Sequence, residues 1–196
     1  MPCCLFSVSR AALRAALIAI VLFASSAHCA CASETVEICF NYGCAHREEV
    51  QIADADIEAA HSVLGQPADA GEERARLGRA VALLYVAAAR TTPIAHDRGG
   101  NFPYDPGVSG VMDCIDHSTN TTAFLALLQK NGLLRFHEAG PRLKRMRFLA
   151  EHWAGQVIER ATGAVYAVDS WYFDHGEPAV VMPERDWRWG RDPRKR

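Results

Sequence analysis

Long hydrophobic runs are scarce in this chain of 196 residues, and its net charge is small. The most apolar run, residues 15–24, is too short to span a bilayer comfortably, because a transmembrane helix needs about 20 apolar residues. The formal net charge of −2 gives no argument for nucleic acid as the main partner. The sequence also has no internal repeat. These absences argue against membrane-spanning, nucleic-acid-binding and repeat proteins.

The first 32 residues have the layout of a secretory signal peptide. Two arginines precede the apolar run, and small residues then lead to an A-x-A cleavage pattern at residues 30–32. A lipoprotein is the less favoured alternative, because neither Cys29 nor Cys31 follows the Leu-small-small pattern of a lipid-attachment site. We therefore expect cleavage near Ala32, no stable membrane insertion afterwards, and a periplasmic or secreted protein.

The chain that remains after cleavage has the length of one domain with a real hydrophobic core. We assign residues 33–190 to this domain and residues 191–196 to a basic tail. All 23 acidic residues and all but two of the 21 basic residues lie after the leader, which gives a net charge of −4.

Cysteine is sparse after the leader, where Cys39, Cys44 and Cys114 are the ones that remain. An exported protein meets an oxidising compartment, in which thiols tend to pair. Cys39 and Cys44 lie in the stretch CFNYGC, which predicts a small disulfide loop. Cys114 is then left over, and such a cysteine indicates a reactive thiol or an intermolecular link. A buried apolar cysteine is the alternative.

The pattern of apolar residues predicts helices in the first part of the domain and strands in the second. Helices are expected over residues 51–64, 71–90 and 113–131, and strands over residues 152–159, 164–170 and 179–182. A loop rich in glycine and proline, residues 91–112, leads to Cys114 and is long enough to be functional. We interpret the basic cluster at residues 142–147 as a solvated face, with contact to an anionic polymer as the minor alternative.

Cys114 lies in the first turn of its predicted helix, with Asp113 as the N-cap. The helix N-terminus favours the thiolate form, which is the nucleophile. The carboxylates of Asp113 and Asp116 oppose it, because nearby negative charges disfavour a second one. A histidine from elsewhere in the fold is therefore needed to activate the thiol.

His152 and Asp169 are the best candidates to complete a triad. If the hairpin pairs Glu159 with Ala164, then Ala154 faces Asp169, and His152 lies diagonally from Asp169 on the same face. A slip of one residue would place them on opposite faces. The aspartate can then orient the imidazole, which takes the thiol proton and returns it to the leaving amine.

The oxyanion of such a reaction needs hydrogen-bond donors. The backbone N–H of Cys114 is one candidate, and Asn101 and Tyr104 in the preceding loop are candidates for the second. Trp153 is interpreted as a core residue or a wall of the substrate cleft.

The stretch from Gly107 to Trp171 resembles the transglutaminase-like superfamily of papain-like cysteine enzymes. The resemblance rests on a cysteine that opens a helix, His152 followed by an aromatic residue, and V-D-S-W around Asp169 on the next strand. The D-C-I-D run at Cys114 resembles the bacterial transglutaminase-like cysteine peptidases, which are exported. This resemblance implies an α+β fold with N-terminal helices, in which the nucleophile helix packs against a small antiparallel sheet that carries His152 and Asp169. It also implies an amide-bond hydrolase or acyl transferase with a peptide or protein substrate and no cofactor.

Two other classes of function stay open. Cys114, His117, His152 and Asp169 include zinc-binding residue types, although no paired C-x-x-C or H-x-x-x-H motif is present, and we assign no metal ligands. No D-x-D-x-D-G loop suggests calcium either. The other alternative is a non-catalytic binding protein on a degenerate transglutaminase-like fold. His117 lies one turn after Cys114 and is interpreted as a solvated or helix-face histidine, with modulation of the thiol or metal binding as the less favoured alternatives.

Overall fold

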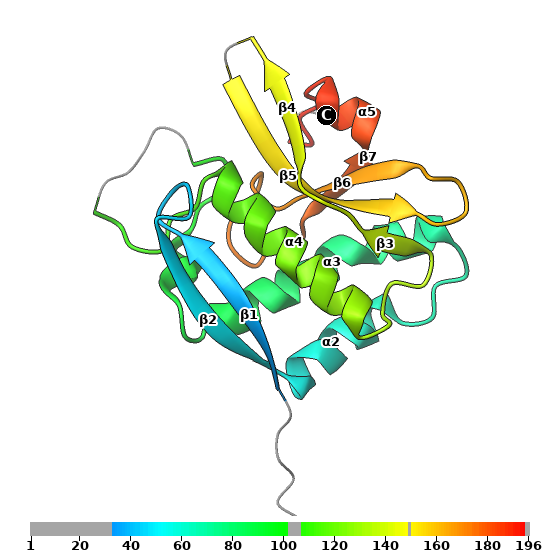
Figure 1. Ribbon diagram of the computed structural model, residues 1–196, viewed down its shortest axis with the longest axis horizontal. Helices are drawn as coiled ribbons and strands as arrows, with labels where there is room; N and C mark the ends of the chain where they lie inside the picture. The colour runs from blue at the N-terminus through cyan, green and yellow to red at the C-terminus, as the bar shows by residue number, and fades with distance from the viewer. Residues whose placement is uncertain (1–32, 102–106, 149, 195–196) are drawn as a thin grey trace, which may run out of the picture. The chain divides into compact units, whose positions relative to one another are not determined.

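The computed structural model describes residues 33–101, 107–148 and 150–194, which form an α+β fold (Figure 1). The expected α+β class is confirmed. The helices are α2 (Asp54–Leu64), α3 (Ala70–Ala88), α4 (Cys114–Lys130) and α5 (Glu184–Arg188), with the 3-10 helix η1 (Pro93–His96) after α3. The strands are β1 (Ser33–Phe40), β2 (His46–Ala53), β3 (His137–Ala139), β4 (Leu143–Arg147), β5 (Ala150–Glu159), β6 (Val165–Asp169) and β7 (Val180–Pro183). Among the described residues, no helix has the length and apolarity that crossing a membrane requires.

The long strand β5 organises a curled antiparallel sheet with the order β3-β5-β6-β7. The first half of β5 pairs with β4 and its last residues pair with β3, while β6 pairs with residues 155–158. The β4–β5 hairpin consequently projects beyond the rest of the sheet (Figure 1).

The predicted register of the β5–β6 hairpin is confirmed. Gly155 pairs with Val168, and the N–H of Glu159 donates to the carbonyl of Ala164 at 2.8 Å. Continuing this register brings Ala154 opposite Asp169, as the sequence count required. No bulge interrupts the paired residues, so His152 keeps the parity that places it on the same face as Asp169.

Helix α4 packs directly against β5, and a glycine permits the close approach. A Cβ added at Gly155 would lie 2.8 Å from Cγ2 of Thr121 on α4, which is closer than packed atoms tolerate. Phe124, Leu125 and Leu128 of α4 are fully buried in the main core. This packing fixes the helix that begins at Cys114 against the strand that carries His152.

The N-terminal part of the domain differs from the sequence prediction. Residues 51–53 end strand β2, so the helix expected from residue 51 begins at Asp54. Strand β2 pairs with β1 along its whole length, and only Val50 and Ile52 of β2 are buried. A strand with so few buried side chains gives a weak alternating pattern, which explains why the hairpin was missed.

The predicted disulfide between Cys39 and Cys44 is confirmed. The connection between β1 and β2 has four consecutive residues with positive φ, from Asn41 to Cys44. Only Gly43 of the four adopts such angles without steric cost. Four left-handed residues in a row reverse the chain tightly between the two cysteines.

Glu73 of α3 is a buried carboxylate that holds the segment before β3. It accepts hydrogen bonds from the backbone N–H groups of Arg135, Phe136 and His137, and it bonds Nδ1 of His137 at 2.7 Å. Burial alone would raise the pKa of Glu73, but these hydrogen bonds outweigh it and hold the pKa below its ordinary value. The ionised form of Glu73 therefore stabilises the fold.

The variant Glu73→Gln is expected to lower the free energy of unfolding at pH 7 by about 1–3 kcal/mol, because an amide cannot accept all these hydrogen bonds. Because the pKa is lowered in the folded state, this stabilisation is present above the ordinary pKa of 4.5 and is lost as the pH falls below it. Urea unfolding at pH 7 and pH 3.5 measures both effects. Glu58→Gln, a change at an exposed residue of α2, is the control. An equal loss of unfolding free energy in Glu73→Gln and Glu58→Gln would contradict the prediction.

Candidate active site

Cys114 is the first residue of α4 and is partly exposed. The predicted N-cap is confirmed, because the carboxylate of Asp113 accepts hydrogen bonds from the N–H groups of Ile115 and Asp116. In return, Asp116 Oδ2 accepts from the N–H of Asp113 at 3.0 Å, which completes a capping box. Two adjacent carboxylates thus fix the turn that carries the candidate nucleophile.

The disulfide loop between Cys39 and Cys44 hydrogen-bonds to this turn. The N–H of Gly43 donates to Asp113 Oδ2 at 3.0 Å, and the N–H of Cys44 donates to Asp116 Oδ1 at 2.6 Å. Burial raises the pKa of Asp116 to about 6, and the charge of Asp113 adds to the shift against the opposing hydrogen bonds. The loop and the helix start therefore form one hydrogen-bonded unit.

The structure brings His152 and Asp169 together. Nε2 of His152 lies 2.7 Å from Oδ2 of Asp169, a carboxylate that is 1% exposed. Two further donors hold that carboxylate, namely Nε1 of Trp187 at 2.8 Å and the N–H of Trp171 at 3.2 Å. The aspartate is consequently fixed on both oxygens and can orient the imidazole.

An aromatic cage surrounds the ring of His152. Ring centroids of Trp171, Trp187 and Tyr172 lie 4.8, 5.7 and 6.0 Å from it, respectively. These rings exclude water from the His152–Asp169 pair and restrict rotation of the imidazole. Trp171 and Tyr172 directly follow the predicted V-D-S stretch, whereas Trp187 comes from α5, a helix that the sequence prediction lacked.

Cys114, His152 and Trp171 line one cleft of about 860 Å³. Asn101 also lines it, and its side-chain amide donates to Asp97 Oδ1 at 2.9 Å. Tyr104, the other candidate oxyanion donor, lies outside the described residues. The indole of Trp153 is not part of the cleft lining and stacks on the guanidinium of Arg142 at 4.8 Å. The tryptophan at the cleft wall is therefore Trp171.

The thiol of Cys114 is harder to ionise than a free thiol. Burial raises its pKa to about 11, and the charges of Asp113 and Asp169 add to the shift. The backbone N–H of Trp153 acts in the opposite direction by hydrogen bonding to the sulfur. The thiol is accordingly protonated at neutral pH, and a proton acceptor has to act when it reacts.

A second buried network, which the sequence did not predict, joins α4 to the end of β6. His117 is 4% exposed, so its interpretation as a solvated residue is wrong. Its Nε2 lies 2.9 Å from Asp97 Oδ2, and its Nδ1 lies 2.8 Å from Oγ of Ser170. Ser170 also contacts the hydroxyl of Tyr85 at 3.0 Å. The spacing of three between Cys114 and His117 could not reveal these partners, which come from a distant loop and strand.

Asp97 connects this network to the loop before Cys114. Its Oδ1 accepts a hydrogen bond from the N–H of Met112 at 2.7 Å in addition to the one from Asn101. The buried carboxylate of Asp97 therefore holds helix α4, the loop before Cys114 and a residue of the cleft wall.

The residues proposed as zinc-binding types do not gather into a common ligand set in the described part of the chain. The group that does gather three potential ligand atoms there consists of Cys39, Cys44 and Asp116. Both of its sulfur atoms are joined in the disulfide, so the carboxylate of Asp116 is the one group of this cluster that is still able to bind a metal.

In comparisons with known proteins, no family model matches the chain, and no curated protein or solved structure matches it either.

The variant Asp97→Asn is expected to lower the free energy of unfolding by about 1–3 kcal/mol, because an amide cannot serve His117, Met112 and Asn101 together. Urea denaturation at pH 7 measures the loss. Asp174→Asn, an exposed change nearby in the fold, is the control and should cost less than about 1 kcal/mol. Equal stability of the Asp97 variant and the native protein would show that the network does not hold the site.

Proposed function

We propose that the protein is an exported, cysteine-dependent enzyme of the transglutaminase-like kind that acts on amide bonds of peptides or proteins. Cys114, His152 and Asp169 are its proposed triad. The observation that carries this proposal is the buried His152–Asp169 hydrogen bond in a cleft shared with Cys114. The cleft has the size of many small-molecule and peptide sites.

The geometry supports a definite order of proton transfer. Asp169 holds Nε2 of His152, so Nδ1 is left as the proton acceptor in the neutral tautomer. The thiol proton moves to Nδ1 as the sulfur of Cys114 bonds to the acyl carbon and the carbonyl electrons move onto oxygen. Because the thiol pKa is about 11, this transfer accompanies the attack and does not precede it.

The tetrahedral intermediate then collapses to an acyl-enzyme. The N–H of Cys114, at the start of α4, is the proposed oxyanion donor, and Asn101 is the proposed second donor from the cleft wall. His152 returns its proton to the leaving amine as the carbon–nitrogen bond breaks. Water hydrolyses the thioester in a peptidase or amidase, and an amine accepts the acyl group in a transferase.

The leader at residues 1–32 and the Cys39–Cys44 disulfide both support a periplasmic or secreted location. A non-catalytic binding protein is the second candidate, and the raised pKa of Cys114 is the observation that favours it. The enzyme and the binding protein differ in how strongly the reactivity of the Cys114 thiol depends on His152.

The rate of iodoacetamide labelling of Cys114, measured against pH, is expected to distinguish the enzyme from the non-catalytic binding protein. In His152→Ala only the thiolate reacts, so the rate should keep rising well above neutral pH, because burial and the charges of Asp113 and Asp169 raise the thiol pKa. In the native protein His152 takes the thiol proton as the sulfur attacks the reagent, so labelling near neutral pH should not be limited by the small fraction of thiolate. At pH 7 the native rate should exceed that of the variant by on the order of 100-fold.

Mass spectrometry of the intact protein measures the rates, and His61→Ala on the surface is the matched control. Overlapping pH profiles for the native protein and His152→Ala would remove the chemical basis of the enzyme and favour the binding protein.

Asp113→Asn is expected to make Cys114 easier to ionise. Asparagine caps a helix about as well as aspartate but has no charge, so it removes one cause of the raised thiol pKa. In the His152→Ala background, the midpoint of labelling should shift to lower pH. The one oxygen of asparagine can still cap α4 but leaves the N–H of Gly43 without that acceptor, so a small fall in melting temperature is expected. An unshifted midpoint would show that this carboxylate does not act on the sulfur.

A further inference from the structure

Two arginines of the β4–β5 hairpin line the cleft. Arg145 and Arg147 are separated by two positions on β4, so their side chains lie on one face of the strand. Arg145 pairs in register with His152, and Arg147 pairs with Ala150. All four residues line the cleft that contains Cys114. The two guanidinium groups are therefore on the same wall as the proposed general base.

Arg145 is held in place without a carboxylate. Its guanidinium donates to the hydroxyl of Tyr172 at 3.2 Å and to the backbone carbonyl of Trp187, and it lies over the Trp187 ring at 4.7 Å. A guanidinium has five N–H donors, so these contacts leave several unused. Arg145 is consequently a preorganised cation beside His152.

Arg147 is exposed and borders the chain at Gly190. Neither Arg145 nor Arg147 has an ion-pair partner within the described ranges, whereas the two acidic residues of the cleft are occupied. Asp113 accepts three backbone N–H groups, and Glu151 is paired with Lys144 at 2.6 Å. The unmatched charge on this wall is positive.

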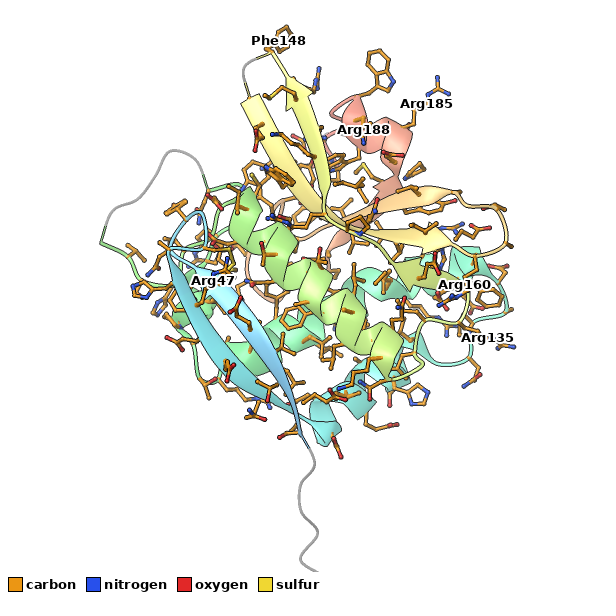
Figure 2. The ribbon with its side chains drawn as sticks, viewed as in Figure 1. Arg47, Arg135, Phe148, Arg160, Arg185 and Arg188 are labelled. Atoms are coloured by element: carbon orange, nitrogen blue, oxygen red, sulfur yellow. A yellow bond between two sulfur atoms is a disulfide. The ribbon has the colours of Figure 1, made fainter. Side chains whose placement is uncertain are left out.

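The tip of the β4–β5 hairpin carries an exposed apolar residue, Phe148, whose backbone is strained. Phe148 is 95% exposed, also lines the cleft and has a φ of 54°, an angle that costs a bulky residue roughly 1–2 kcal/mol (Figure 2). A fully exposed phenylalanine gains nothing from the fold in return. Its place in the cleft lining leaves it free to contact a ligand there.

We propose that the cleft selects a peptide with an acidic side chain close to the scissile amide, whose carboxylate is bound by Arg145 and Arg147. Phe148 packs against a neighbouring apolar residue of the same peptide. A carboxylate matches the planar fork of a guanidinium, and Arg145 and Arg147 present two such forks to the same cleft. This inference rests on the proposed function, because it concerns the same cleft.

Tripeptidyl chloromethyl ketones based on Ala-Ala-Ala test it, with Glu, Gln or Lys placed at each of the three positions in turn. The sulfur of Cys114 displaces chloride, and the mass of the intact protein reports the second-order rate. At one position or more, the Glu reagent should react about tenfold faster than the Gln reagent, and the Lys reagent should be slowest.

Arg147→Gln should reduce the preference for Glu over Gln to within about twofold. Arg160→Gln is the matched control, because it removes the same charge from an exposed site at the opposite end of β5 (Figure 2). It should keep the full preference.

The outcomes separate the two proposals. Equal rates for Glu, Gln and Lys at all three positions, with labelling that still depends on His152, would overturn the acidic substrate and leave the triad intact. A preference for Glu that Arg147→Gln does not change would overturn the role of the hairpin arginines. Labelling that is as fast in His152→Ala as in the native protein would overturn the proposed function itself.

Discussion

The site depends on the pairing of two carboxylates, Asp113 and Asp116, at the start of α4. Each caps the other's backbone N–H, and the disulfide loop binds both through Gly43 and Cys44. This arrangement fixes the turn that carries Cys114. It also places the negative charge of Asp113 near the sulfur, which works against the helix dipole. The fold thus positions the thiol firmly, while the proposed base, His152, comes from strand β5.

The end of β6 links the two polar networks of the domain. Asp169 and Ser170 are consecutive, and their side chains bond to different histidines. Asp169 binds His152 in the cleft, and Ser170 binds His117 on the buried side of α4. The alternation of side chains along an extended chain accounts for this division. A single dipeptide therefore joins the strand that bears the proposed base to the helix that bears the proposed nucleophile.

The parts of the fold that local patterns determine could be predicted from the sequence. The N-cap of α4, the β5–β6 register and the Cys39–Cys44 pairing each follow from residues near one another in the chain. Other parts depend on contacts between distant segments. The basic stretch that forms β4 has one buried residue, Leu143, and gives almost no strand pattern.

Helix α5 is similarly short, and its importance comes from Trp187, whose indole reaches Asp169 from 18 residues away. The partners of His117 are equally remote in sequence, since Asp97 precedes it by 20 residues and Ser170 follows by 53. A histidine on a helix carries no local signal that separates a buried network from a solvated face.

The tight connection between β1 and β2 has a consequence for how Cys39, Cys44 and Cys114 sort themselves during oxidation. Cys39 and Cys44 are only five residues apart, so closing their loop costs far less chain entropy than joining either one to Cys114. Correct pairing is thus favoured before any tertiary structure exists. Within the described part of the chain, Cys114 is then the cysteine left as a free thiol. Sorting of this kind lets a protein form one disulfide and keep another cysteine reduced.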